Sequence, residues 1–201
     1  MYNWRRMTAE QRELVLRLRK LSHHPWHGPP HRTAERAQYH VDAANYEHRV
    51  VVGHTPSRMA WFEAAVLSVL QEAGAHVLAW CILPNHYHLL IQTEDVLATI
   101  KALGRLHGRS SRAWNMEDAT VGRTCWHRAA ERSIKSDRHY WATMNYIHHN
   151  PVHHCYVRQW QEWPFSSARL FIEHMGHDAA VQLWNEFPVL RYGEGWDNPD
   201  A

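Results

Sequence analysis

Four polar side chains in this sequence have the types and the spacing needed for metal-assisted cleavage of a phosphodiester. His86 and His88 stand two residues apart in an apolar run, and Tyr146 and Asn150 stand four apart just before a proline. Two imidazoles and an amide oxygen can hold a divalent cation that polarises a phosphate oxygen, and a nearby cation favours the phenolate form of a tyrosine nucleophile. This chemistry requires the two pairs to meet in the folded chain.

The run that contains the two histidines has the pattern of a β-strand. His86 and His88 alternate with Tyr87 and Leu89, and residues at period two point to the same face of a sheet. Both imidazoles are therefore expected on one face, with backbones about 7 Å apart. In an apolar strand the ring nitrogens need polar partners. A shared cation is one solution, and hydrogen bonds to backbone carbonyls are the other.

The segment that contains the tyrosine has the pattern of a helix end. Pro151 is expected to terminate a helix over residues 137–149, because proline cannot donate the next backbone hydrogen bond. Residues four apart share a helix face, so Tyr146 and Asn150 are expected to project together. One helix face could then supply a nucleophile and a third metal ligand, although Tyr146 taken alone also fits a half-buried packing residue.

Taken together, the two segments resemble those of a known family. Leu83–Leu89 resembles the HUH motif (His, hydrophobic, His) of single-tyrosine transposases. Tyr146–Val152 is similar to the Tyr-Ile-x-x-Asn-Pro-Val signature of the REP-associated tyrosine transposases, an IS200-like branch of that group. Trp163–Ser167 resembles a Trp-Pro-Tyr-Ser-Ser run found there, and the resemblance covers about residues 37–170.

The resemblance implies an enzyme that cleaves and rejoins DNA. Tyr146 would be the catalytic residue, and His86, His88 and Asn150 would bind Mg²⁺ or Mn²⁺. The implied function is that of a metal-dependent single-strand DNA endonuclease and strand-transferase. It would act on hairpin (REP-like palindromic) DNA through a covalent 5′-phosphotyrosine intermediate during DNA transposition. Relaxases of the HUH group instead place their tyrosine before the histidines, and replication initiators carry a lysine where this chain has Asn150.

Basic residues indicate where DNA could bind. A helical pattern after the HUH strand sets four of them along one side, opposite Leu97, Ile100 and Leu103: Lys101, Arg105, Arg109 and Arg112. Such a stripe can follow a DNA backbone, although an ordinary solvated helix face has the same pattern. Arg128 is also predicted to bind DNA, because Trp126–Arg128 is an approximate counterpart of a Trp-Gln-Arg strand in relatives.

The order of the elements predicts an α+β fold with an antiparallel sheet and helices on one face. The resemblance implies the ferredoxin-like split βαβ arrangement of HUH endonucleases. Strands are expected at 37–45, 76–83, 86–93 and 125–134, with a possible short strand at 48–52. Helices are expected at 8–21, 57–74, 96–113, 137–149 and 178–186. The expected organisation is an N-terminal helical extension and linker (1–35), a tyrosine transposase domain (36–175), and a C-terminal helix and tail (176–201).

Composition is compatible with a cytoplasmic protein. The three cysteines have no CxxC spacing, which favours neither a disulfide framework nor a zinc knuckle and suggests a reducing compartment. No apolar run reaches membrane-spanning length, and the first residues lack a signal-peptide core, so no membrane partner is expected. The net charge of +2 does not by itself demand nucleic acid. The expected partner is single-stranded or hairpin DNA, bound by a monomer or a homodimer.

Two other functions remain open on the sequence alone. A catalytically silent descendant of the same fold could bind DNA hairpins without cutting them. A histidine-rich metal-binding protein with no nucleic-acid role could instead use His148, His149, His153 and His154, although these pairs lack a regular metal-ligand spacing.

Overall fold

The computed structural model describes residues 37–190 and 192, all within one unit of the chain, residues 35–201. The predicted helix at 8–21, the domain boundary near residue 35 and most of the predicted C-terminal tail lie outside the described residues. Within the described ranges, no helix is both long enough and apolar enough to span a bilayer.

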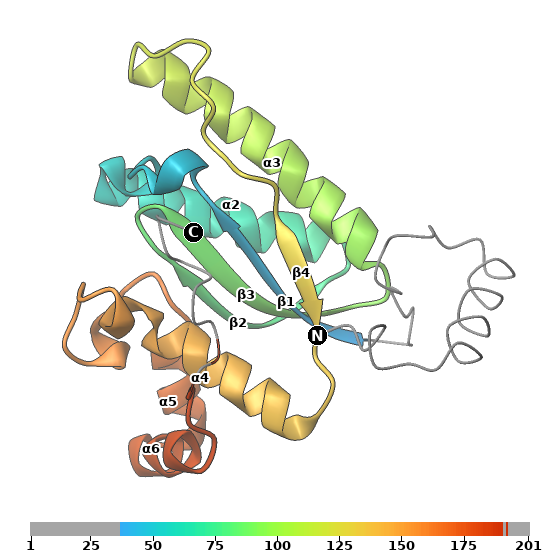
Figure 1. Ribbon diagram of the computed structural model, residues 1–201, viewed down its shortest axis with the longest axis vertical. Coiled ribbons are helices and arrows are strands. Elements are labelled where there is room, and N and C mark those ends of the chain that lie inside the picture. Colours follow the sequence, from blue (N-terminus) through green and yellow to red (C-terminus); the bar gives the residue numbers. More distant parts are fainter. Residues whose placement is uncertain (1–36, 191, 193–201) are drawn as a thin grey trace, which may run out of the picture. The chain divides into compact units, whose positions relative to one another are not determined.

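A four-stranded antiparallel sheet forms the centre of this unit, which confirms the predicted α+β class (Figure 1). Its strands are β1 (Ala37–Ala44), β2 (His76–Ile82), β3 (His86–Thr93) and β4 (Ala130–Ser133), in the order β2-β3-β1-β4. β1 and β3 are therefore interior strands. Seven of the eight residues of β3 are buried, so both faces of this strand need a covering layer.

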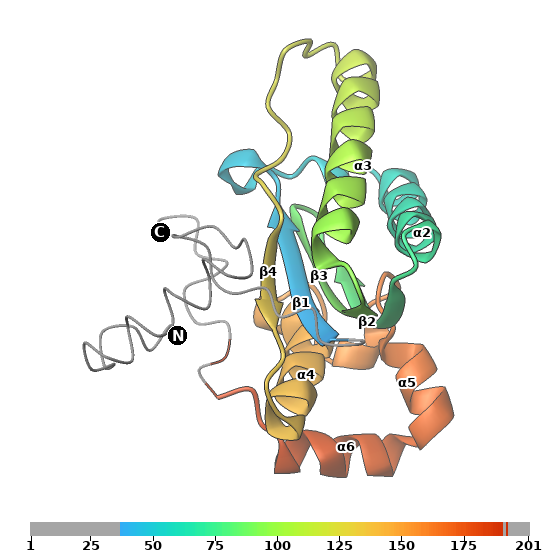
Figure 2. The same cartoon turned by 90° about the vertical axis from the view of Figure 1, so that its right-hand side faces the viewer.

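Helices α2 (Pro56–Glu72) and α3 (Val96–Glu117) cover one face of the sheet (Figure 2). Tyr87 and Leu89 of β3 belong to the same buried cluster as Phe62 of α2 and Leu103 of α3. The prediction of helices on one face holds for this pair.

Helix α4 (Asp137–His153) adds a layer on the opposite face (Figures 1 and 2). Leu90, which alternates with the residues facing α2 and α3, packs in a second cluster with Met144 and Ile147 of α4. This second layer covers the face of β3 that carries His86, His88 and Leu90, all of which are buried. Helices α5 (Ala168–Met175) and α6 (His177–Glu186) pack beside α4.

The predicted short strand at 48–52 is wrong. The chain forms two 3₁₀ turns there, Tyr46–His48 and Val52–His54, with Glu47 and His48 in the left-handed region at φ 53° and 49°. The side-chain oxygen of Asn45 accepts hydrogen bonds from the backbone N–H groups of Val51 and Val52, which pulls the chain away from an extended path.

Two predicted boundaries also need correction. α4 continues past Pro151 to His153, although Pro151 leaves the Ile147 carbonyl without its usual donor. The buried surface of α4 offsets that loss. The strand predicted at 125–134 is limited to β4 and to an isolated bridge between Trp126 and Asn45, and the residues between them line a pocket beside α3. Helix α5 was not predicted from the sequence.

A buried ion pair joins the start of α2 to the end of α3. Arg58 donates to the two carboxylate oxygens of Asp118 at 2.6 and 3.1 Å, and Arg123 donates to the same carboxylate at 2.7 Å. The side chain of Arg58 is 3% exposed, and its guanidinium also lies 5.4 Å from the ring of Trp114. These hydrogen bonds hold the pKa of Asp118 well below its usual range, so the carboxylate stays ionised.

Candidate metal and tyrosine site

The turn before β3 fixes the orientation of His86. The side-chain nitrogen of Asn85 donates to the His48 carbonyl at 2.9 Å, which leaves its oxygen to accept from His86 Nδ1 at 2.8 Å. In a neutral imidazole with hydrogen on Nδ1, the lone pair is on Nε2. His86 therefore directs an acceptor nitrogen away from the turn.

A close backbone contact supports this turn. Gly53 donates its N–H to the Pro84 carbonyl at 2.7 Å, and a Cβ at Gly53 would lie 2.3 Å from the Pro84 Cβ and 2.5 Å from its Cα. Glycine is needed here because a side chain would push the turn that carries His86.

The structure brings the four predicted site residues together from β3 and α4. Asn150 Oδ1 lies 3.1 Å from His86 Nε2, and the ring centroid of Tyr146 lies 5.1 Å from that of His88. His86, His88, Asn150 and Tyr146 are 2%, 1%, 0% and 5% exposed. The predicted meeting of strand and helix is thus observed, while the catalytic and metal-binding roles of these residues stay predictions.

The facing atoms of His86 and Asn150 fit a divalent cation. With Nδ1 protonated, His86 Nε2 and the Asn150 oxygen are both acceptors, so two lone pairs face each other unless a cation or a second proton lies between them. Ligands about 2.1 Å from an octahedral cation stand about 3 Å apart, close to the 3.1 Å observed. The other end of the amide, Asn150 Nδ2, is buried and makes no hydrogen bond with any described residue. The donor set suits Mg²⁺ or Mn²⁺.

Two residues of β1 near the site were missed by the sequence reasoning. Asp42 pairs with His88 across the sheet and His40 pairs with Leu90. Among the described residues, His40, Asp42 and His88 form a group whose possible metal-ligand atoms all lie within 4.8 Å of one another. His40 and Asp42 stand two apart in a predicted strand, and this spacing could have indicated that both side chains point to the same face. Their nearness to His88 depends on strand register, which the sequence does not give.

Two more aromatic residues line the site. The ring of Tyr192 lies 5.4 Å from that of Tyr146, and the ring of His154 lies 4.8 Å from that of His86. Nothing in the spacing of Tyr192 pointed to this contact. His154 follows α4 directly, so its place was foreseeable once the helix was known to continue past Pro151.

The predicted DNA-binding residues lie apart from this site, on the α3 side of the sheet. All five are exposed: Lys101, Arg105, Arg109 and Arg112 on α3, and Arg128 on the segment before β4. The apolar side predicted for α3 needs one correction, since Leu97 is 55% exposed while Leu103 is buried. DNA binding by these residues stays a prediction.

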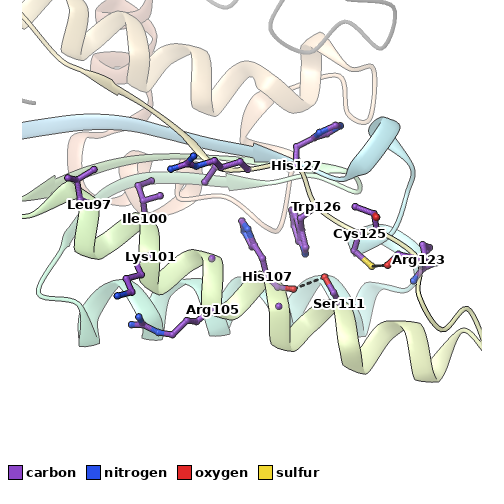
Figure 3. A pocket seen from close by; sticks show the side chains of 15 residues that line it. Leu97, Ile100, Lys101, Arg105, His107, Ser111, Arg123, Cys125, Trp126 and His127 are labelled. Carbon is purple, nitrogen blue, oxygen red and sulfur yellow. Dashed lines mark hydrogen bonds between the residues drawn. The ribbon is translucent and has the colours of Figure 1, made fainter. Parts of the chain in front are cut away.

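A groove of 860 Å³ lies between α3 and residues 123–129, and we call it the α3 groove. Lys101, Arg105 and Arg128 are among its lining residues. Figure 3 shows the side chains of His107 and Trp126 next to each other in its lining, and their rings stack with centroids 4.3 Å apart. Burial lowers the pKa of His107 to about 4, so its ring is neutral near pH 7. The basic side chains thus supply the positive charge.

His148 is part of the core. It is 0% exposed, its Nε2 lies 2.9 Å from the Ser167 hydroxyl, and its ring stacks on Trp160. Burial lowers its pKa to about 3. These contacts account for His148 as a core residue, one of the four histidines on which the histidine-rich metal-protein alternative depends.

Residues 33–150 match the family described as "Transposase IS200 like". The chain belongs to this family of transposases, and the predicted resemblance is confirmed.

The chain is similar to two curated relatives. It is 29% identical over 120 residues to a putative REP-associated tyrosine transposase of Haemophilus influenzae (53% of this chain, 66% of the relative). It is 28% identical over 104 residues to the REP-associated tyrosine transposase of Escherichia coli (51% of this chain, 60% of the relative). The match thus spans slightly less than two thirds of each relative.

The fold is also similar to a solved structure of a REP-associated tyrosine transposase bound to a REP hairpin. The TM-score is 0.54 at 19% identity, covering 70% of this chain and 81% of that one. The similarity establishes a shared fold.

Proposed function

We propose that this chain is a metal-dependent single-strand DNA endonuclease and strand-transferase that acts on hairpin DNA through a covalent bond to Tyr146. The observation that carries the proposal is the meeting of Tyr146 with His88 and of Asn150 with His86 in one buried site. We place the enzyme in the cytoplasm, where its free cysteines would stay reduced.

The proposed reaction needs no outside energy source. His86, His88 and Asn150 would hold the divalent cation, which would supply positive charge to a phosphate oxygen. The Tyr146 oxygen attacks phosphorus and forms the phosphotyrosine bond, the bond to the 3′ oxygen breaks, and that oxygen takes up a proton. The 3′-hydroxyl can later attack the phosphotyrosine and release the tyrosine. Because Tyr146 is 5% exposed, the phosphate reaches it only after neighbouring side chains shift.

We assign DNA binding and chemistry to different faces of the sheet. The α3 groove and the basic stripe offer several positive charges to a hairpin stem. β4 is an edge strand of the sheet, so an unpaired strand leaving the stem could pass this edge toward Tyr146. The REP hairpin in the solved relative supports a palindromic substrate for this chain.

Removing stripe charges should weaken DNA binding without changing the chemical step. For Arg105→Ala with Arg109→Ala we expect hairpin affinity to fall about tenfold and the slope of log affinity against log salt to decrease by about 1–2. Adduct formation at saturating DNA should stay near the wild-type rate. Titrations at several salt concentrations measure this, with Arg169→Ala on α5 as an exposed control. Equal affinity in the double variant and the control would remove α3 from the DNA site.

Removing the proposed metal should stop cleavage but preserve hairpin binding. Chelator, or His86→Ala, should reduce the adduct at least a hundredfold, since the phosphate charge is no longer offset. Mn²⁺ binding by electron paramagnetic resonance should weaken in His86→Ala. Full adduct formation in chelator would contradict the metal requirement.

A further inference from the structure

His88 belongs to a network of buried and half-buried side chains that reaches from β3 to α4. Its Nδ1 lies 3.2 Å from His40 Nε2, and His40 Nδ1 lies 3.3 Å from the Tyr192 hydroxyl. That hydroxyl lies 2.8 Å from the hydroxyl of Thr143, which lies 2.7 Å from the His139 carbonyl. We call His88, His40, Tyr192 and Thr143 the His40 network.

The hydrogens of this network can run in two directions. A carbonyl oxygen only accepts, so Thr143 donates its one hydroxyl hydrogen either to the His139 carbonyl or to Tyr192. In the first case Tyr192 donates its hydrogen to Thr143 and accepts one from His40 Nδ1, so His40 Nε2 carries a lone pair and accepts from His88 Nδ1. His88 then keeps its lone pair on Nε2. In the second case His88 carries its hydrogen on Nε2, and that nitrogen cannot bind a cation.

We propose that His40 and Tyr192 are positioning residues that hold His88 in the tautomer with its lone pair on Nε2, the form in which that nitrogen can bind a divalent cation. The inference rests on the proposed metal role of His88. A histidine ligand generally donates its other ring nitrogen to a partner that fixes its orientation, and loss of that partner weakens metal binding. Asn85 does this for His86, and the His40 network would do it for His88.

Existing contacts of β1 favour this role over direct metal binding by His40 and Asp42. His40 Nε2 is directed at His88 Nδ1, and Asp42 forms an ion pair with Arg132. A cation shared by His40, Asp42 and His88 would have to displace the hydrogen between His40 Nε2 and His88 Nδ1 and compete with Arg132 for Asp42. His40 is 0% exposed, so breaking its hydrogen bonds without replacement is costly. His40 therefore acts through His88.

The test measures the tautomer of His88 and metal affinity in the full chain, without DNA. Nitrogen-15 NMR of the metal-free protein should show hydrogen on Nδ1 of His88. Tyr192→Phe keeps the ring beside Tyr146 but removes the hydroxyl, and His40→Phe removes both nitrogens. In both variants we expect a mixture of His88 tautomers and a Mn²⁺ affinity lower by about tenfold or more. His40→Gln retains an acceptor toward His88 and should recover much of the affinity.

Tyr87→Phe is the matched control. It removes another buried tyrosine–histidine hydrogen bond, 3.0 Å from Tyr87 to His107, on the opposite face of β3. This variant should lose stability but keep the His88 tautomer and Mn²⁺ affinity. An unchanged tautomer in His40→Phe, or an equal affinity loss in Tyr87→Phe, would overturn the inference. If the wild type has the expected tautomer and binds Mn²⁺ but forms no adduct, the inference stands and the proposed function fails.

Discussion

Tyr146→Phe is expected to abolish covalent capture of DNA while hairpin affinity stays within about twofold of the wild type. The variant lacks the only atom of this side chain that can attack phosphorus, so adduct formation should fall by at least about a thousandfold. The phenylalanine ring keeps the apolar packing of the tyrosine against His88 and His40. Binding through α3 is on the other face and should be unaffected.

The measurement is a denaturing gel with labelled single-stranded hairpins drawn from DNA flanking the gene, in manganese or chelator. The wild type should give a metal-dependent band of slowed mobility that is absent in Tyr146→Phe. A second tyrosine, Tyr192, lies beside Tyr146, so Tyr192→Phe is the matched hydroxyl deletion and should retain the adduct at saturating metal. An adduct of equal yield in Tyr146→Phe would reject the assigned nucleophile. Hairpin binding without any adduct would instead favour the catalytically silent alternative.

Asp118→Asn is expected to lower the free energy of unfolding by about 3 kcal/mol, because it leaves the buried guanidinium of Arg58 without its main counter-charge. The side chain of Arg58 is 3% exposed and its remaining acidic partner, Glu117, is 58% exposed. Denaturant unfolding measures the change. Glu117→Gln removes the exposed partner and should cost less than about 1 kcal/mol. If Asp118→Asn and Glu117→Gln lowered the free energy of unfolding equally, burial of the Arg58–Asp118 pair would not determine its contribution to stability.

Acid should reduce the difference between wild type and Asp118→Asn. The folded-state pKa of Asp118 lies below its ordinary value because Arg58 donates to the carboxylate. Its stabilising contribution is therefore complete above the ordinary carboxyl range and is lost as the pH falls toward the folded-state pKa. Unfolding curves from pH 7 downward should show the two proteins converging below about pH 4. A constant difference across that range would contradict the assigned ion pair.

The sequence predicted the parts of the site that depend on local periodicity. Alternation placed His86 and His88 on one strand face, and a spacing of four placed Tyr146 and Asn150 on one helix face. In the structure the two histidines lie on β3, and Tyr146 and Asn150 lie on α4, as predicted. The spacing alone did not show that the strand and the helix meet; the family resemblance implied it.

The remaining parts depend on contacts between distant segments. His40 lies beside His88 because β1 and β3 pair in one particular register, and Tyr192 reaches His40 from the far end of the described chain. The separation of the basic stripe from the metal site has the same origin. Its position depends on which sheet face α3 covers, and the helical pattern within α3 carries no such information.

Pro151 shows why a strong local signal was misleading. A proline normally ends a helix by removing one hydrogen bond and crowding the preceding turn. Here the surrounding residues of α4 are buried against the sheet and the neighbouring helices, and this packing keeps the last turn helical. Tertiary contacts outweighed the local preference.

The alternation along β3 also limits how this gene can change. His86 and His88 face Asn150 and Tyr146, while Tyr87 between them faces the α2 and α3 layer. A one-codon insertion or deletion within this strand would exchange the two sets of side chains, moving imidazoles into the apolar core and a core tyrosine into the metal site. Catalysis and folding would fail together. Lineages of this chain should therefore accept length changes in loops such as the one after α3, and almost none within β3.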